Sequence, residues 1–289
     1  MKRIIIFGSG QMGQMLKKHL GGDYEVLCFV DNAKEKQGTY LEGVKVLSPK
    51  EALKLNPEAI LLGVLDNDRG SAMRTQLKEL GFHGEIITGE MLRVFDARVA
   101  TMNLLANEIG ERELAGACGE LGVYKGEFAR CINRAFPDRK LYLFDTFEGF
   151  VEGDVNTETA QGFSRAKVGD FSDTDEVTVR ESMPFKENVI TQKGIFPESL
   201  SEASESLSDE RFVFVSLDAD LYEPTKAGLE FFWERLVPYG VIMLHDYNSG
   251  QFRGVKKAFV EFAEGHEDFL TFPVCDLHGS LVIKKLAGK

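Results

Sequence analysis

The sequence has 289 residues, a length typical of about two domains of ordinary size. With 43% hydrophobic and 28% charged residues, it has the composition of a soluble globular protein. No apolar stretch is long enough to span a bilayer, and the start leads straight into a short strand-like run, so no signal peptide is expected. The four cysteines show no paired spacing, which argues against a disulfide or zinc framework. These features predict a cytoplasmic protein without a membrane partner.

The net charge of −12 is carried by the second part of the chain. Residues 1–112 contain 15 basic and 15 acidic side chains, whereas residues 113–289 contain 19 basic and 31 acidic ones. An acidic half repels the phosphates of DNA and RNA, so no nucleic-acid partner is expected. Most of these carboxylates are expected on the solvated surface, and a few could bind a cation.

The first part of the chain alternates strand and helix patterns. Apolar strands separated by helices are typical of a parallel sheet covered on both faces. We therefore assign residues 1–90 to a small Rossmann-like nucleotide-binding domain of the α/β class. Short apolar runs predict its strands at residues 4–7, 25–30, 44–47, 59–65 and 85–88.

A long helical pattern leads to the second part of the chain, and we assign residues 91–112 to a helical linker. Residues 113–289 repeat the alternation as a second domain. Its last two strands are too close together for a crossover helix, so a hairpin is expected there. The fold class is α/β with two doubly wound domains, the second with an antiparallel edge. Strands of the second domain are expected at residues 118–123, 141–145, 189–191, 212–217, 241–244, 269–274 and 280–284.

A glycine motif lies between the first strand and the first helix. It follows the pattern G-x-G-x-x-G through Gly8, Gly10 and Gly13, and Asp31 ends the next strand. Such glycines let a pyrophosphate approach a helix N-terminus, and the acid can hold ribose hydroxyls. These four residues are candidates for a nucleotide site; the alternative is that the glycines serve only the turn and helix packing. The segment resembles the small Rossmann-like domains of bacterial sugar-modifying enzymes.

A second glycine motif opens a helix in the second domain, with the spacing acid-x-Gly-x-x-x-Gly. S-adenosylmethionine has no pyrophosphate, so its site needs small residues beside the methionyl part and an acid that binds the ribose hydroxyls. Asp145, at the end of the next strand, can be this acid. The alternative is that the glycines are structural and that Asp145 caps a helix. The candidates for this cofactor site are Glu120, Gly122, Gly126, Asp145, Thr146 and Phe147.

Two neighbouring strands deliver polar side chains at their carboxyl ends. Asp218 and Asp220 follow one strand, and His245 and Asp246 follow the next. Because ligands bind outside the carboxyl ends of an open parallel sheet, these side chains are expected to converge. Packed carboxylates need a cation or a proton, and magnesium binds through one or two carboxylates. We assign Asp218 and Asp246 as metal ligands, with His245 as a candidate third ligand.

The same cluster offers a base for methyl transfer. A hydroxyl group is a poor nucleophile at neutral pH, but a metal that holds the two oxygens of a vicinal diol lowers the hydroxyl pKa and fixes its line of attack. Asp220 is the candidate general base. The alternative is that these acids cap helices or pair with Lys226 and Arg253.

The second domain resembles the macrocin O-methyltransferase family, which methylates sugar hydroxyls of macrolides and related antibiotics. This resemblance implies a class I methyltransferase fold that uses S-adenosylmethionine and magnesium, with Asp218, His245 and Asp246 at metal-binding positions and Asp220 as the base. Some relatives carry two aspartates in place of His245 and Asp246, so manganese or another transition metal is an alternative to magnesium. The resemblance covers roughly residues 100–260 and rests on the segments 120–126 (ELGVYKG), 145–150 (DTFEGF), 194–199 (GIFPES), 217–222 (LDADLY) and 245–247 (HDY).

The sequence therefore predicts a divalent-metal-assisted O-methyltransferase acting on a small-molecule sugar or polyol, either nucleotide-linked or glycan-linked. The long polar stretch 151–175 is expected to be a lid that shapes acceptor specificity. An NAD-dependent oxidoreductase and a nucleotide-binding regulatory protein, both using the first domain, are the alternatives. Whether the chain forms a homo-oligomer is left open. Four histidines lack a partner pattern and are expected at the surface or in packing: His19, His83, His266 and His278.

Overall fold

The computed structural model describes residues 1–20, 23–64, 67–88, 96–201, 207, 209–276 and 278–287. The chain divides into two compact units, Met1–Asp96 and Ala97–Lys289, and each is described by itself. None of the helices in the described ranges is long and apolar enough to cross a membrane.

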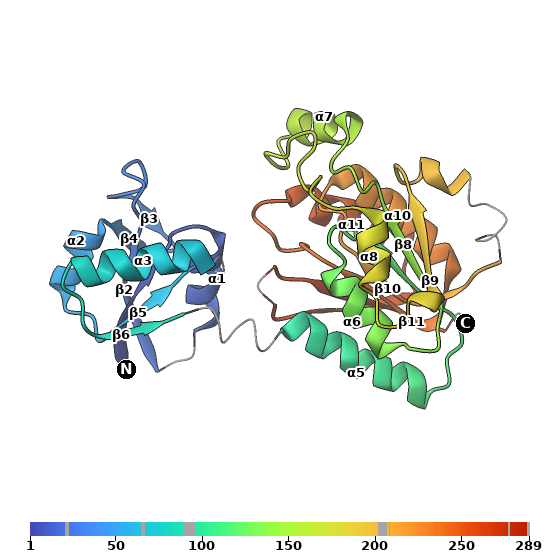
Figure 1. Cartoon of the computed structure of the whole chain (residues 1–289), viewed down its shortest axis with the longest axis horizontal. Coiled ribbons are helices and arrows are strands. Elements are labelled where there is room, and N and C mark those ends of the chain that lie inside the picture. The colour runs from blue at the N-terminus through green and yellow to red at the C-terminus, as the bar shows by residue number, and fades with distance from the viewer. Residues whose placement is uncertain are drawn as a thin grey trace. The chain divides into compact units, whose positions relative to one another are not determined.

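The first unit is a doubly wound α/β fold around a six-stranded sheet (Figure 1). Its strand order is β3-β4-β2-β1-β5-β6, and neighbouring strands run parallel except for the short pair β3 and β4. Its elements are β1 (Lys2–Phe7), α1 (Gln11–His19), β2 (Tyr24–Val30), β3 (Tyr40–Leu41), β4 (Val44–Leu47), α2 (Pro49–Ala52), a 3-10 turn (Leu53–Leu55), β5 (Ala59–Leu62), α3 (Asn67–Glu79) and β6 (Glu85–Ile87).

Both faces of this sheet are covered. Ile4 and Ile6 of β1 belong to one hydrophobic cluster, against which Leu16 of α1 packs, whereas Ile5 belongs to a second cluster with Leu77 of α3. Successive side chains of a strand point to opposite faces, so a strand covered on both sides needs a continuous apolar run. The predicted parallel sheet of the first unit is confirmed.

The second unit is built on a seven-stranded sheet of order β12-β13-β11-β10-β7-β8-β9 (Figure 1). Strand β13 runs antiparallel to both β11 and β12, which confirms the predicted hairpin at the edge of a parallel sheet. Its elements are α5 (Ala97–Glu111), β7 (Ala117–Leu121), α6 (Glu127–Ala135), β8 (Leu141–Asp145), α7 (Glu152–Gln161), α8 (Glu176–Glu181), β9 (Val189–Lys193), β10 (Phe212–Leu217), α10 (Tyr222–Arg235), β11 (Leu236–Leu244), α11 (Arg253–Gly265), β12 (Phe269–Pro273) and β13 (Leu281–Lys285), with 3-10 turns at Lys186–Asn188 and Glu198–Ser201.

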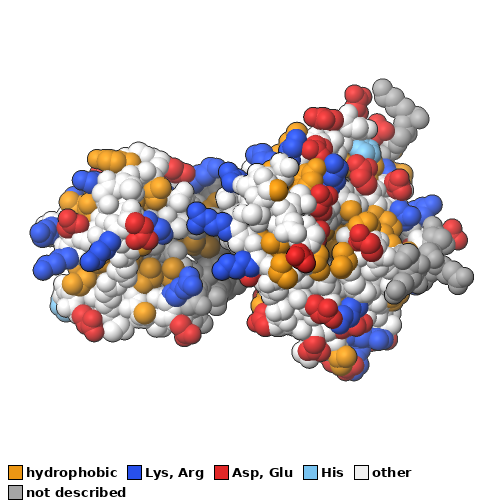
Figure 2. Space-filling view, turned by 90° about the horizontal axis from the view of Figure 1, so that it is seen from above, with side chains coloured by type: hydrophobic (Ala, Val, Ile, Leu, Met, Phe, Trp, Pro, Cys, Tyr) orange, Lys and Arg blue, Asp and Glu red, His pale blue; other side chains and the backbone are white. Residues whose placement is uncertain are grey.

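Two hydrophobic clusters cover the faces of the second sheet. One cluster includes Phe232 of α10 and Phe259 of α11, and the other includes Met102 of α5 and Ile132 of α6. The acidic side chains of the second unit are scattered over the face shown in Figure 2, among basic and apolar ones, as expected of solvated surface carboxylates.

The structure differs from the sequence prediction in two segments. Helix α5 begins at Ala97 and lies within the second unit, so it is part of that unit's core rather than a free linker; residues 89–95 of the expected linker lie outside the described residues. The stretch 151–175, expected to be a long loop, contains helix α7, which ends at Gly162 with a φ of 64°.

Candidate active site

The glycine loop after β7 lies directly against the end of β10. Gly122 has a φ of 84°, and a Cβ atom added there would lie 2.1 Å from the backbone oxygen of Asp218. Gly126, with a φ of 72°, begins α6, and a Cβ added there would lie 2.9 Å from a methyl group of Val179. Only glycine fits both positions. The proposed cofactor loop and the proposed metal site are therefore in backbone contact.

Asp145, at the end of β8, connects this glycine loop to the loop that follows β8 through hydrogen bonds. Its Oδ2 accepts hydrogen bonds from the backbone N–H groups of Val123 (2.6 Å) and Tyr124 (2.9 Å), and its Oδ1 accepts one from Phe147 (2.7 Å). A carboxylate has about four acceptor positions. Oδ1 therefore keeps capacity for one ligand hydroxyl, while most of the side chain orders the loops.

Thr146 and Phe147 shape the turn that follows. The Thr146 hydroxyl donates a hydrogen bond to the Gly149 carbonyl at 2.8 Å. The Phe147 side chain is 4% exposed and belongs to the hydrophobic core, so the residue contributes to the site through its backbone N–H on Asp145. The structure thus gives both residues a supporting position rather than direct exposure to the crevice.

Glu120 lies buried in β7 at the base of the glycine loop, with 1% exposure. Burial raises the pKa of its carboxyl group to about 8, against the opposing effect of Arg98. Among the described residues, its Oε2 has no hydrogen-bond partner. A buried acceptor without a partner is destabilising unless a ligand satisfies it, so Glu120 fits a site for a group that carries donors.

Three carboxylates meet at the carboxyl ends of β10 and β11. One oxygen from each of Asp218, Asp220 and Asp246 lies within 4.8 Å of the others. Oxygens that share a magnesium or calcium ion at 2.0–2.6 Å are separated by no more than about this distance. Asp220 and Asp246 adopt φ angles of 59° and 53°, a strained conformation that aims both side chains into the cluster.

The electrostatics of the cluster indicate a shortage of positive charge. Burial and the neighbouring charges of Asp218 and Asp246 raise the pKa of Asp220 well above its usual range. Burial has the same tendency at Asp218, but His245 and Arg98 outweigh it and lower the pKa of Asp218 to about 2. For His245, burial lowers the pKa, and the Asp218 carboxylate outweighs it and raises the pKa to about 9. A proton on Asp220 and another on His245 thus balance the acids, as a bound cation would.

Arg98 and Ser216 belong to the site and were missed by the sequence analysis. Arg98, in the first turn of α5, donates from Nη1 to Asp218 Oδ2 at 2.8 Å and from Nη2 to the Ser216 hydroxyl at 2.9 Å. Its guanidinium lies 3.8 Å from the centre of the Phe128 ring, a cation–π contact. No local spacing links Arg98 to Asp218, because 120 residues separate them.

His278 is exposed, as expected, but it also lies at the site, which the sequence did not indicate. Its Nδ1 lies 3.5 Å from Asp246 Oδ1, and its ring centre is 4.7 Å from that of His245. His245, Asp246 and His278 form a second group whose ligand atoms lie within 4.8 Å of one another. The loop before β13 carries His278 to the end of β11 because the edge hairpin folds back beside that strand.

Two sets of ligands could hold a divalent cation, and Asp246 belongs to both. One is the three carboxylates, and the other is Asp246 with the two histidines. The all-carboxylate group suits magnesium, whereas two imidazoles with one carboxylate suit a transition metal. Asp218 is also bound by two cations, because its Oδ1 lies 2.7 Å from His245 Nδ1 and its Oδ2 accepts from Arg98. A metal ion at Asp218 would therefore share these oxygens with Arg98 or displace His245.

The glycine motif of the first unit also has the expected geometry. A Cβ atom on Gly13 would lie 1.9 Å from the Gly8 carbonyl oxygen, so α1 packs against the turn, while a Cβ on Gly10 would meet no atom within 4 Å. Asp31 accepts hydrogen bonds from the backbone and hydroxyl of Ser9 and pairs with Lys36 at 3.1 Å. Packing explains Gly13, and nucleotide binding by Gly8, Gly10, Gly13 and Asp31 stays a prediction.

Two family models match the chain. The model described as macrocin O-methyltransferase (TylF) matches residues 86–280, and the model described as C2185-like, N-terminal matches residues 1–87. The first match covers the whole glycine loop and carboxylate cluster. No curated protein matches the chain in sequence.

Solved structures share the fold at low sequence identity. The calicheamicin methyltransferase CalS11 is 17% identical, with a TM-score of 0.54 over 83% of this chain and 92% of that chain. The O-methyltransferase NovP is 18% identical, with a TM-score of 0.50 over 66% of this chain and 80% of that chain. These likenesses show the fold, which is the Rossmann-like α/β fold of class I methyltransferases, as expected.

Proposed function

The chain belongs to the macrocin O-methyltransferase family, and we propose that it methylates a hydroxyl group of a sugar or polyol with the help of a divalent cation. The family makes it an S-adenosylmethionine-dependent O-methyltransferase. The acceptor, the metal dependence and the roles of individual residues are the proposed part.

One observation carries the proposal. The glycine loop that would hold the methyl donor packs backbone to backbone against Asp218, the first residue of a cluster of three carboxylates. A methyl donor on the loop and a hydroxyl at the cluster would therefore be neighbours. Methyl transfer needs this proximity, because the attacking oxygen must approach the sulfonium methyl in line.

The residues of the donor site have separate tasks. Gly122 and Gly126 leave room along the loop, Asp145 offers its free acceptor position to a ribose hydroxyl, and Glu120 offers its buried Oε2 to a donor group of the methionyl part. The hydrogen bonds from Val123 and Tyr124 to Asp145 fix the loop before the donor binds. Such preorganisation lowers the entropic cost of binding.

The residues of the acceptor site hold the cation and move a proton. Asp218, Asp246 and His245 or His278 would hold a divalent cation, which supplies charge neutralisation and lowers the pKa of a hydroxyl group beside it. Asp220 is the proposed base: it takes the proton of the acceptor hydroxyl as the oxygen attacks the methyl carbon. The strained backbone of Asp220 holds its carboxyl in the cluster, where a nearby cation favours the ionised form needed to accept that proton.

Calorimetry with S-adenosylhomocysteine and a metal titration test the proposal together. We expect micromolar binding of S-adenosylhomocysteine, and loss of that binding in Gly122→Ala, whose new methyl group would overlap the Asp218 backbone. The matched control is Gly153→Ala in α7, where a Cβ meets no atom within 4 Å. Because Gly122→Ala can fail to fold, Asp145→Asn provides a milder loss of affinity. Wild-type protein that binds neither the product nor a divalent cation would contradict the proposal.

A further inference from the structure

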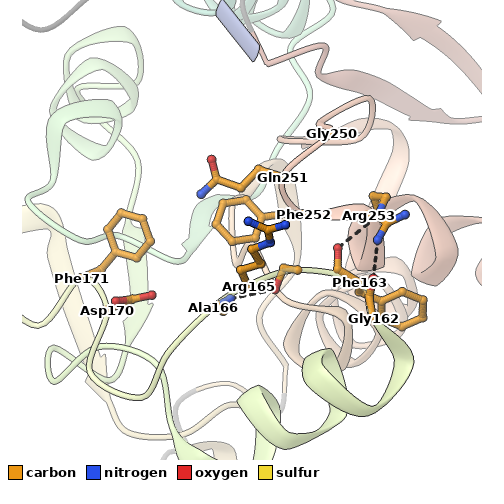
Figure 3. A pocket seen from close by; sticks show the side chains of 11 residues that line it. Gly162, Phe163, Arg165, Ala166, Asp170, Phe171, Gly250, Gln251, Phe252 and Arg253 are labelled. Carbon is orange, nitrogen blue, oxygen red and sulfur yellow. Dashed lines mark hydrogen bonds between the residues drawn. The ribbon is translucent and has the colours of Figure 1, made fainter. Parts of the chain in front are cut away.

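A cavity of about 820 Å³ lies between two segments of the second unit (Figure 3). One segment is the stretch after α7, from Gly162 to Phe171, and the other is Gly250 to Arg253 at the start of α11. Ligand pockets typically measure about 300–1,000 Å³, so this cavity can hold a molecule larger than a single sugar ring.

Contacts of two lining residues connect the walls of this cavity to the glycine loop and to the carboxylate cluster. On one side, the ring of Phe171 packs edge-on against Tyr124 of the glycine loop, with 5.2 Å between ring centres. On the other side, the backbone N–H of the lining residue Gln251 donates a hydrogen bond to the Ser249 hydroxyl. The backbone N–H of Ser249 in turn donates one to the carbonyl oxygen of Asp246. The cavity therefore lies beside both parts of the proposed site, and an acceptor held in it would have to extend past the lining residues to reach the methyl donor and the carboxylates.

The segment between Gly162 and Phe171 is held at both ends. At its start, Arg253 donates hydrogen bonds to the carbonyl oxygens of Gly162 and Phe163. At its end, Phe150 exchanges backbone hydrogen bonds with this segment, donating to Asp170 at 3.0 Å and accepting from Gly169 at 2.9 Å. Between these ends, Ala166 packs against the hydrophobic core, and its N–H donates a hydrogen bond to the Ser164 hydroxyl at 3.3 Å.

Arg165 occupies this middle position. In Figure 3 its side chain extends toward Gln251 and Phe252, whereas Arg253 turns back to Phe163. Among the described residues, no carboxylate forms an ion pair with Arg165 or Arg253. The carboxylate of Asp170, which also lines the cavity, accepts a hydrogen bond from the backbone N–H of Lys167 at 2.8 Å, within the same turn of the chain. In the described part of the chain, Arg165 is thus a cation without an ion pair, at a cavity that is also lined by Arg253 and Asp170.

The remaining walls suit a ring-shaped, partly apolar group. Phe163, Phe171 and Phe252 line the cavity, and the Phe171 side chain is 41% exposed. An aromatic ring and a guanidinium in the walls of one cavity can together bind a ring that carries an anionic group. Arg pairs with phosphate through two parallel hydrogen bonds, as it does with a carboxylate, so the guanidinium indicates an anionic group on the acceptor.

We infer that this cavity is the acceptor site and that Arg165 selects acceptors that carry a phosphate or diphosphate ester. The inference rests on the proposed function, which it narrows to phosphorylated glycosides. Nucleoside diphosphate sugars and lipid diphosphate sugars share this chemistry. In either case Arg165 would bind the diphosphate.

Calorimetry of the full chain tests this inference, with saturating S-adenosylhomocysteine and with EDTA present so that no metal holds the phosphate. The probes are pyrophosphate, UDP and farnesyl diphosphate, with a neutral methyl rhamnoside as reference. We expect at least one diphosphate to bind, and Arg165→Gln to weaken it about tenfold, which corresponds to about 1.4 kcal/mol. Arg165→Lys should keep part of the affinity. Lys167→Gln, which removes an exposed cation outside the cavity lining, should change it less than twofold.

The possible outcomes separate the two proposals. Preference for UDP or for farnesyl diphosphate identifies the carrier, and both support the inference. Failure of all diphosphates to bind overturns it, as does binding that Arg165→Gln leaves unchanged, which would indicate the glycine motif of the first unit instead. Equal losses of diphosphate affinity in Arg165→Gln and Lys167→Gln would show that only the overall charge of the protein matters, which would also overturn the inference. If S-adenosylhomocysteine itself does not bind, the proposed function fails and the inference fails with it.

Discussion

The guanidinium of Arg98 donates a hydrogen bond of 2.8 Å to the carboxylate of Asp218, which joins the first turn of α5 to the end of β10. The pair is largely buried, with 11% and 22% of the two side chains exposed. A buried carboxylate needs such a partner, since an unpaired charge in the protein interior is strongly destabilising. Arg98 therefore holds Asp218 ionised and oriented before any cation arrives.

Replacing Arg98 should destabilise the second unit and make it more dependent on metal. In Arg98→Gln the Asp218 carboxylate loses its partner, and we expect the free energy of unfolding to fall by about 3 kcal/mol. A divalent cation neutralises the same carboxylate, so added Mn²⁺ should raise the melting temperature of the variant more than that of the wild type. Arg112→Gln removes an exposed pair with Glu108 on the same helix and should have an effect below about 1 kcal/mol.

Replacing the proposed base should abolish turnover but spare binding. In Asp220→Asn the side chain keeps its shape but cannot take a proton, and we expect kcat to fall about 10²- to 10⁴-fold. The affinity for S-adenosylhomocysteine, measured by calorimetry, should stay within about threefold, because in the described part of the chain no hydrogen bond joins the donor loop to this side chain. Turnover at the wild-type rate would remove Asp220 from the mechanism.

The two imidazoles should decide which metal supports activity. His278 lies beside Asp246 and His245, and nitrogen ligands favour Mn²⁺ and later transition metals over Mg²⁺. We expect the metal-free wild type to regain more activity with Mn²⁺ than with Mg²⁺, and His278→Ala to lose this preference. His83→Ala, at an exposed position of the first unit, is the control. An unchanged ratio of Mn²⁺ to Mg²⁺ activity in His278→Ala would exclude His278 as a ligand.

Glu120 should make the stability of the second unit pH-dependent. Its pKa is about 8 in the folded chain and about 4.3 when unfolded, so the folded state binds the extra proton between these values. Stability from this group is therefore present at low pH and is lost as the pH rises toward 8. Glu120→Gln cannot ionise, so its stability relative to wild type should increase by at most about 1.4 kcal/mol per pH unit from pH 5 to 8. A difference that is constant with pH would show that Glu120 is ionised throughout.

The fold and the centre of the site follow from local sequence patterns. Continuous apolar strands predict the two covered sheets, and the short spacing between β12 and β13 predicts the antiparallel edge. Asp218 and Asp246 could be predicted to meet because they lie within two residues of the carboxyl ends of neighbouring parallel strands. In such cases the backbone geometry of neighbouring strands alone brings the residues together.

Arg98 and His278 could not be found in this way. Each approaches the cluster from an element outside the neighbouring parallel strands: Arg98 from α5, and His278 from the loop before the edge strand β13. Their positions depend on how α5 packs on the sheet and how the hairpin folds back, which are tertiary properties. Helix α7 was missed because Gly153, Asp154, Asn156 and two threonines weaken its helix signal.

The central claim is that a divalent cation and the methyl donor occupy adjoining sites at the ends of β7, β10 and β11. The most direct measurement is anomalous diffraction at the manganese edge from crystals grown with S-adenosylhomocysteine and Mn²⁺. We expect one strong anomalous peak within coordination distance of Asp246 and of Asp218 or His278, with the nucleoside density along the Gly122 loop. Nucleoside density with no manganese at the carboxylates, or manganese bound only elsewhere, would contradict it.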